Sequence, residues 1–419
     1  MRLQSVCGGK TISVWEKLIV ILLALGPILQ HYKGLFVNAA VTMLLVLLPF
    51  VAVKLLHKGS VPLRRLTLVL PLMLLFVYEV VAHGTTVMET GQAFVFILYF
   101  LAVAAGCLNT KYFVRAITAV AIIASVAIIV QYICYYLLGF HLQLAPTSLL
   151  SQQGQQWVLL AQTGRVSVTG KPISFYRPSA FFLEPSHMFI YMFTPLLITL
   201  LSPNFGKREF RIAALITVGM IFSTSGMGIL TAAGAWLLFL AKNGGKNTRL
   251  DLRKLLRPRS VLILLALLVV VVCLMIWVPF FRNSVMRIFS SGSDYKNAVS
   301  GRVTSGIGVL QGMTGKQLLF GVADNTKAVA VNLTGFSEEM YKYGIVGTLV
   351  SYLFYVQGLF RLKNQFFWVS LIVIVMSFFT QHSHSSFFML YCAFTFTEGF
   401  RRQQEAAESG SIEISHPSR

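Results

Sequence analysis

The segment YRPSAFFLEPSHMF, residues 176–189, brings three side chains that could do chemistry to the start of a long apolar run: Arg177, Glu184 and His187. A carboxylate stands out there, because the chain has only 14 acidic residues in 419. Pro185 suits the first turn of a helix and disfavours helical geometry at the residue before it. We therefore expect Glu184 at a helix start, with its carboxylate near free backbone N–H groups and His187 one turn further in.

Two interpretations of Glu184 follow from its neighbours. Arg177 lies seven residues earlier, which is two helical turns, so an interfacial salt bridge between the two could lock the loop. The alternative is a functional carboxylate, because an ionisable group at membrane depth costs about 2.5–3.5 kcal/mol on insertion scales. We take Glu184 as a candidate catalytic residue, and Arg177 and His187 as candidate substrate-binding residues.

A second arginine stands at the centre of SGRVTSG, residues 300–306. The guanidinium group of Arg302 is a planar fork of donors, which suits a phosphate better than the point charge of a lysine. A solvated surface arginine is the alternative. Arg302 is therefore a candidate for substrate binding.

Two adjacent glutamates stand in GFSEEMYKYGIVGT, residues 335–348. Glu338 and Lys342 are spaced i,i+4 and are predicted to form an ordinary helical salt bridge, with Glu338 also a candidate for substrate binding. Glu339 has no obvious partner nearby in the sequence. Its carboxylate is therefore a candidate catalytic base or glycan-binding group.

Two further motifs indicate structure rather than chemistry. HSHS at 382–385 has no acid or cysteine nearby and reads as an interfacial loop, not a zinc set. FSTSGMG at 222–228 is a tight turn of small residues that allows close helix packing. We expect no metal and no cofactor.

The elements that must position these residues are helices in lipid. Of the residues, 56% are hydrophobic and 12% are charged, about half the charged share of a soluble domain. Apolar runs recur between short polar breaks, and helices satisfy their own backbone groups in lipid. The predicted fold class is all-α: a polytopic membrane protein with about twelve transmembrane helices and two large extracytoplasmic loops, in a single domain over residues 1–400. The spans are expected at 18–31, 35–53, 66–82, 92–108, 114–138, 180–201, 209–223, 226–241, 260–281, 336–358, 366–381 and 386–400.

Basic residues set the orientation of these spans. The net charge is +21, and basic residues crowd alternate loops near 54–65, 207–211 and 242–259, the positive-inside pattern of cytoplasmic loops. An even number of spans places both termini in the cytoplasm, with 401–419 as a disordered tail.

The loops at about 139–179 and 282–335 then face outward. Their excess of basic residues suits an anionic ligand. Nucleic acid is not an expected partner, because no basic segment outside the apolar runs carries base-stacking aromatics. In the second loop, Val303, Ile307 and Leu310 predict a short amphipathic helix.

Together these motifs resemble those of the O-antigen polymerase and ligase superfamily, particularly the Wzy-type polymerases of bacterial polysaccharide repeat units. The resemblance covers the whole topology and rests on RPSAFFLEPSH, the STSGMG turn, SGR followed by LLFGVADN, and the E-x-x-x-x-G-x-x-G pattern of Glu339, Gly344 and Gly347. RPSAFFLEPSH is the most specific of these motifs.

The resemblance implies a GT-C-type glycosyltransferase in the bacterial cytoplasmic (inner) membrane. Such an enzyme would move a growing glycan from undecaprenyl pyrophosphate to another lipid-linked oligosaccharide repeat unit. Arginines would stabilise charge on the pyrophosphate, and a carboxylate would take the proton of the attacking hydroxyl. Membrane lipid, a chain-length regulator and a flippase are the other partners that it implies.

Three alternatives remain open. Ligases typically carry a histidine eleven residues before the first glycine of the G-x-x-G pair, where this chain has Leu333. A ligase that transfers the glycan to a lipid A core would therefore lack its base. A flippase or transporter would be expected to show internal repeats or charged or broken helices near the bilayer midplane, which are not evident. Only an activity assay separates a non-catalytic scaffold from the enzyme.

Overall fold

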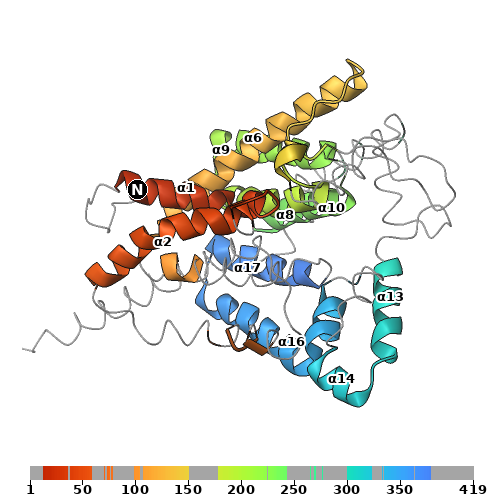
Figure 1. The fold of residues 1–419 in the computed structure, drawn as a ribbon. Coiled ribbons are helices and arrows are strands. Elements are labelled where there is room, and N and C mark those ends of the chain that lie inside the picture. Colours follow the sequence, from red (N-terminus) through yellow and green to blue (C-terminus); the bar gives the residue numbers. More distant parts are fainter. Residues whose placement is uncertain are drawn as a thin grey trace, which may run out of the picture.

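The computed structural model describes residues 13–35, 38–58, 99–103, 107–150, 178–223, 225–242, 300–322, 335–362 and 364–378, with a few isolated positions between them. These residues are mostly helical and include no strand, as the all-α class predicts. The helices gather into a bundle (Figure 1). Their bounds are α1 Val14–Leu29, α2 Ala39–Lys58, α6 Thr110–Tyr136, α8 Pro185–Leu200, α9 Lys207–Phe222, α10 Gly226–Ala241, α13 Ser300–Gln311, α14 Gly315–Phe320, α16 Phe336–Arg361 and α17 Asn364–Ser377, with a 3-10 turn at Thr147–Leu149.

These helices overlap eight of the expected spans and differ from them at some ends. The expected span at 180–201 begins as a helix only at Pro185, because Glu184 has extended backbone angles. The expected spans at 66–82, 92–108, 260–281 and 386–400 lie wholly or mostly outside the described residues, as does the 401–419 tail. The helix predicted around Val303, Ile307 and Leu310 is present as α13; its amphipathic character and the outward position of its loop stay predictions.

Two of the described helices are long and apolar enough to cross a membrane, from Ala39 to His57 and from Thr110 to Tyr136. On α6, one face is buried against the bundle, and the opposite face is exposed yet apolar. A helix at the surface of a soluble protein would carry polar residues there. The outer face of α6 therefore suits lipid; its exposed side chains include Ile123, Val126, Val130 and Ile133.

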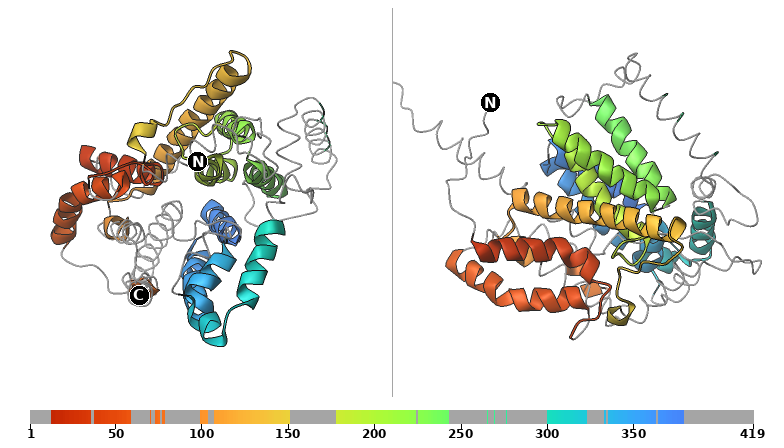
Figure 2. Two further views of the ribbon diagram at one scale, coloured as in Figure 1. Left: turned by 45° about the vertical axis from the view of Figure 1, so that its right-hand side comes forward. Right: turned by 90° about the horizontal axis from the view of Figure 1, so that it is seen from above.

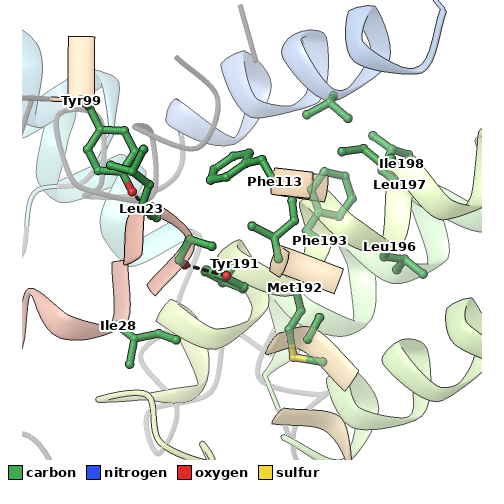
Figure 3. Close-up of a cluster of buried hydrophobic side chains, with 14 of the residues drawn as sticks. Leu23, Ile28, Tyr99, Phe113, Tyr191, Met192, Phe193, Leu196, Leu197 and Ile198 are labelled. Atoms are coloured by element: carbon green, nitrogen blue, oxygen red, sulfur yellow. Dashed lines mark hydrogen bonds between the residues drawn. The ribbon is translucent and has the colours of Figure 1, made fainter. Parts of the chain in front are cut away.

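The helix α8 is the centre of the packing. It packs against α6, α9, α10 and α17, and nearly all of its residues are buried. Figure 3 shows its Tyr191 and Phe193 among buried apolar side chains of α1 and α6, with the Tyr191 hydroxyl donating a hydrogen bond to the Ala24 carbonyl, 2.8 Å away. Glu184 and His187, at the start of α8, are therefore carried by a well-packed element.

The FSTSGMG turn allows the close packing that its small residues predict. The Ser225 hydroxyl caps α10 by accepting a hydrogen bond from the backbone N–H of Gly228, 3.3 Å away. A Cβ atom added at Gly228 would lie 3.1 Å from the Cβ of Phe189 on α8. A larger residue at 228 would push α10 away from the central helix.

The first two helices are joined by an ion pair at the end of the bundle away from the candidate site. The side chains of Ser13 and Glu16 form a capping box at the start of α1. Lys54 near the end of α2 donates a hydrogen bond to the Glu16 carboxylate, which holds the pKa of that carboxyl below its ordinary value. This contact pins the start of α1 to the end of α2.

The four helices α13, α14, α16 and α17 form a second group on the other side of the bundle from α1 and α2 (Figure 2). Within it, α16 packs against α13, α14 and α17, and α17 also packs against α8. The helix α17 therefore lies between the central helix α8 and α16, the helix that carries Glu338 and Glu339.

Candidate functional site

Residues 178–187, PSAFFLEPSH, form a tight turn before the chain enters α8. Its backbone reverses at Ala180, whose φ of 53° lies in the left-handed region that a residue with a Cβ rarely adopts. The hydroxyl of Ser179 donates to the carbonyl of Phe182, 3.0 Å away, and closes the turn. The backbone N–H of Ala180 donates to the side-chain Oε1 of Gln131 on α6, 2.8 Å away.

Gln131 ties three segments together at this turn. Its side chain is only 2% exposed. Besides accepting from Ala180, it donates through Nε2 to the carbonyl of Leu142, 3.0 Å away, in the segment that follows α6. Both ends of one buried amide are thus satisfied, and the strained turn is held against α6.

Replacing Gln131 with leucine should lower the free energy of unfolding by about 1–3 kcal/mol, because the Ala180 N–H and the Leu142 carbonyl would both lose a buried partner. Thermal unfolding of the purified protein in detergent measures the loss. Val130, the next residue on α6, is exposed and provides a matched control as Val130→Leu. Equal unfolding midpoints for the two variants would show that Gln131 does not hold the turn.

Glu184 occupies the N-cap of α8, as its sequence context predicts. Its backbone is extended (φ −150°, ψ 162°), and Pro185 starts the helix. The predicted approach of the carboxylate to free backbone N–H groups is wrong, because the side chain makes no capping hydrogen bond. The hydroxyl of Ser186, two residues on, donates to Glu184 Oε1 instead. The partner of the carboxylate is therefore a side chain of the first turn of α8 and not a backbone N–H group.

One histidine lies next to this carboxylate, and a second histidine stacks on the first. The Nε2 of His187 is 3.8 Å from Glu184 Oε1, with the two side chains 9% and 23% exposed. The ring of His187 stacks on that of His31, with centroids 4.6 Å apart and an angle of 3° between the ring planes. His31 directly follows α1 and its C-cap residue Gln30. The site therefore joins the end of α1 to the start of α8.

Sequence reasoning missed His31. Its neighbours in QHYK, residues 30–33, carry no motif, and 156 positions separate it from His187. Only the packing of the end of α1 beside the start of α8 brings the two rings together. Two cations in this geometry would repel each other by about 4 kcal/mol at an effective dielectric of 20, which favours at most one charged ring.

Tyr32 fixes the other side of the same site. Its hydroxyl donates to the carbonyl of Phe181, 2.9 Å away, inside RPSAFFLEPSH. Its ring packs beside the buried side chains of Leu150 and Leu183. Burial raises the pKa of the Tyr32 hydroxyl, so it stays a neutral donor at physiological pH. Tyr32 and Leu150 thus pack against the segment that leads into Glu184 and α8.

The structure describes only part of what was predicted for the two candidate arginines, Arg177 and Arg302. Arg177 lies outside the described residues. Arg302 lies on α13, and its side chain lies outside the described atoms. Four residues later on α13, a Cβ atom added at Gly306 would overlap the side chain of Ser337, the residue before Glu338. The helix that carries Arg302 therefore borders the first turn of α16.

The first turn of α16 holds both candidate glutamates. The predicted salt bridge between Glu338 and Lys342 is confirmed, with Lys342 Nζ 2.8 Å from Glu338 Oε1. Glu339 is only 2% exposed, so its carboxyl group lies inside the protein. Leu333, at the position of the ligase histidine, is fully buried and packs in a cluster with Tyr341.

Two glycines hold α14 close to the middle of α16. Gly344 breaks α16 with φ 62° and ψ −170°, and Gly321 after α14 has φ 85° and ψ −179°. Both conformations are essentially restricted to glycine. A Cβ atom at Gly344 would overlap the backbone of Leu319, and one at Gly321 would overlap the backbone of Lys342. The end of α14, with the sequence LLFGV, therefore docks backbone to backbone against α16 between Glu339 and Gly344. This close contact holds the part of α16 that carries Glu339.

The two acidic sites lie in neighbouring groups of helices. Glu184 stands at the start of α8, and Glu339 at the start of α16. The helix α17 packs against both α8 and α16, and Figure 1 shows it between them. Within the part of the chain that the structure describes, no group of three or more His, Cys, Asp or Glu side chains could hold a metal ion.

Comparison with known proteins adds no family to this picture. No protein-family model matches the chain, and no curated protein matches it significantly. Its function has to be argued from its residues and their arrangement.

Proposed function

We propose that this chain is a membrane glycosyltransferase that polymerises polysaccharide repeat units. A hydroxyl of one lipid-linked repeat unit attacks the anomeric carbon of the growing glycan. The new glycosidic bond forms as the bond to undecaprenyl pyrophosphate breaks. The proton of the hydroxyl passes to a carboxylate, and the bonding electrons leave with the pyrophosphate.

The observation that carries this proposal is the arrangement of Glu184. In a chain with 14 acidic residues, one carboxylate stands at the start of the most buried helix yet does not cap it. Ser186 and His187 flank it instead, and its side chain keeps 23% of its surface exposed. A carboxylate held by side chains and open on one side can accept a proton from a bound hydroxyl.

Glu339 supports the same chemistry from the neighbouring group of helices. It is buried on α16, which docks against α14 through the close backbone approaches at Gly321 and Gly344. In our proposal Arg177 and Arg302 bind the donor pyrophosphate, His187 and Glu338 contact the substrates, and Glu184 or Glu339 acts as base. No cofactor takes part.

The setting proposed is a twelve-span GT-C-like bundle in the bacterial cytoplasmic membrane, with both termini inside. The apolar outer face of α6 and the two helices of membrane-spanning length support a position in lipid. The outward basic loops would collect the anionic pyrophosphate of the substrate. A chain-length regulator and a flippase are the proposed protein partners.

Purified protein given one lipid-pyrophosphate repeat unit as its only substrate should build a ladder of longer lipid-linked glycans, because donor and acceptor are the same molecule. Gel electrophoresis of the released glycans measures the ladder. Leu333→His should confer no transfer to a lipid A core, because position 333 is fully buried. Transfer of single units to a lipid A core, with no ladder at any stage, would establish a ligase instead.

A further inference from the structure

We propose that His31 is a positioning residue of the Glu184 site, which holds the imidazole of His187 beside the Glu184 carboxylate. The effect on glycan transfer rests on the proposed function. The effect on the accessibility of His187 does not.

The evidence starts with the geometry of the ring pair. The planes of His31 and His187 differ by 3°, and their centroids are 4.6 Å apart, within the range of offset-stacked rings. A flat ring stacked on another loses this contact if it rotates out of the plane. The stack therefore restrains the edge of the His187 ring that carries Nε2. This edge faces the carboxylate, with Nε2 3.8 Å from Glu184 Oε1.

Hydrogen bonds join the two segments that carry the rings, one before His31 in the sequence and one after it. Before His31 along the chain, the Ala24 carbonyl accepts from the Tyr191 hydroxyl, 2.8 Å away. After it, Tyr32 donates to the Phe181 carbonyl, 2.9 Å away. His31 lies between Ala24 and Tyr32 in sequence, as His187 lies between Phe181 and Tyr191. The end of α1 is thus a rigid platform for the start of α8, and His31 is its contact with the site.

The ring of His31 is itself held in place. The side-chain Nε2 of Gln30 lies 3.0 Å from the Nε2 of His31. A hydrogen bond between these two nitrogen atoms restrains rotation of the His31 ring, which keeps its face against His187. The chain of contacts therefore runs from Gln30 through His31 and His187 to Glu184.

Two substitutions of His31 distinguish the effect of its flat ring from the effect of its ring nitrogen atoms. His31→Phe keeps a planar ring to stack on His187, whereas His31→Ala removes it. His57 near the end of α2 is exposed and serves as a matched control in His57→Ala. All variants are compared at equal protein levels and with their unfolding midpoints recorded.

The first measurement does not need glycan transfer. Diethyl pyrocarbonate modifies neutral, accessible imidazole rings, and mass spectrometry of the peptide that contains His187 gives its rate of modification. We expect His31→Ala to raise this rate several-fold, because the ring that covers His187 is gone. His31→Phe and His57→Ala should leave the rate within about twofold of that of the wild type.

The second measurement is the kinetics of ladder formation. Loss of positioning should lower kcat by about tenfold in His31→Ala with little change in KM, because a misplaced group weakens the transition state more than binding. His31→Phe should restore most of kcat. A structural role alone would instead lower the unfolding midpoint and leave kcat of the folded fraction unchanged, which would overturn the proposal.

The outcomes distinguish this role from the proposed function. If the wild-type protein makes no ladder, the proposed function fails, and the role of His31 stands or falls on the modification of His187 alone. An unchanged modification rate in His31→Ala would overturn the positioning role, whatever the protein's activity.

Discussion

Glu184→Gln should slow ladder formation by about a hundredfold or more, because general base catalysis contributes typically 10²–10⁴-fold to a rate. Glutamine keeps the size of the side chain, and its amide oxygen can still accept a hydrogen bond from the Ser186 hydroxyl. It cannot accept a proton or carry the negative charge. The initial rate of glycan extension on one lipid-linked substrate measures the effect.

A second glutamate at a helix start provides the matched control. Glu209 stands in the first turn of α9 and accepts a hydrogen bond from the backbone N–H of Gly206, 3.1 Å away. Glu209→Gln removes the same charge from a helix that carries none of the candidate residues, so ladder formation should stay near the wild-type rate. If Glu184→Gln also keeps that rate at equal protein levels, the base is not Glu184, and Glu339→Gln becomes the next variant to assay.

Gly344→Ala should be among the most destabilising single substitutions in the chain. The backbone of Gly344 adopts a conformation that is essentially restricted to glycine, and such strain costs on the order of 1–3 kcal/mol with another residue. The added Cβ atom would also overlap the backbone of Leu319, which cannot move without pulling α14 away from α16. We expect a total loss above about 3 kcal/mol in the free energy of unfolding.

An open glycine on a neighbouring helix isolates this effect. A Cβ atom added at Gly308 on α13 meets nothing within 4 Å, so Gly308→Ala should stabilise the helix by about 0.5–1 kcal/mol. Thermal unfolding in detergent compares the two variants. Gly344→Ala should also lower glycan transfer in the fraction that stays folded, because the Glu339 turn shifts. Equal unfolding midpoints of Gly344→Ala and Gly308→Ala would contradict this prediction. They would mean that α16 can lose its break at position 344 with no loss in the free energy of unfolding.

The sequence by itself determined the features that depend on a few neighbouring residues. Pro185 sets the start of α8, because its ring disfavours helical geometry at Glu184. The i,i+4 spacing brings Glu338 and Lys342 together on any helix. Apolar periodicity was enough to predict α13. Each of these predictions needed only the backbone geometry of one element, which local residue types specify.

Where two local options compete, sequence reasoning chose wrongly. A carboxylate at an N-cap usually accepts from backbone N–H groups, but the Glu184 carboxylate accepts from the Ser186 hydroxyl. Glutamate is not among the side chains that usually cap a helix, which are the shorter Ser, Thr, Asp and Asn. The roles of Arg177 and Arg302 stay predictions, because their side chains lie outside the described part of the chain.

Only the tertiary structure decided which distant residues share a site. The stack of His31 on His187, the clamp of Gln131 on Ala180 and the close approach of Gly344 to Leu319 all join different elements. No local pattern encodes such contacts, because they depend on which helix faces pack and at what height. The packing of α1, α6 and α8 turns one glutamate at a helix start into a held and partly exposed carboxylate.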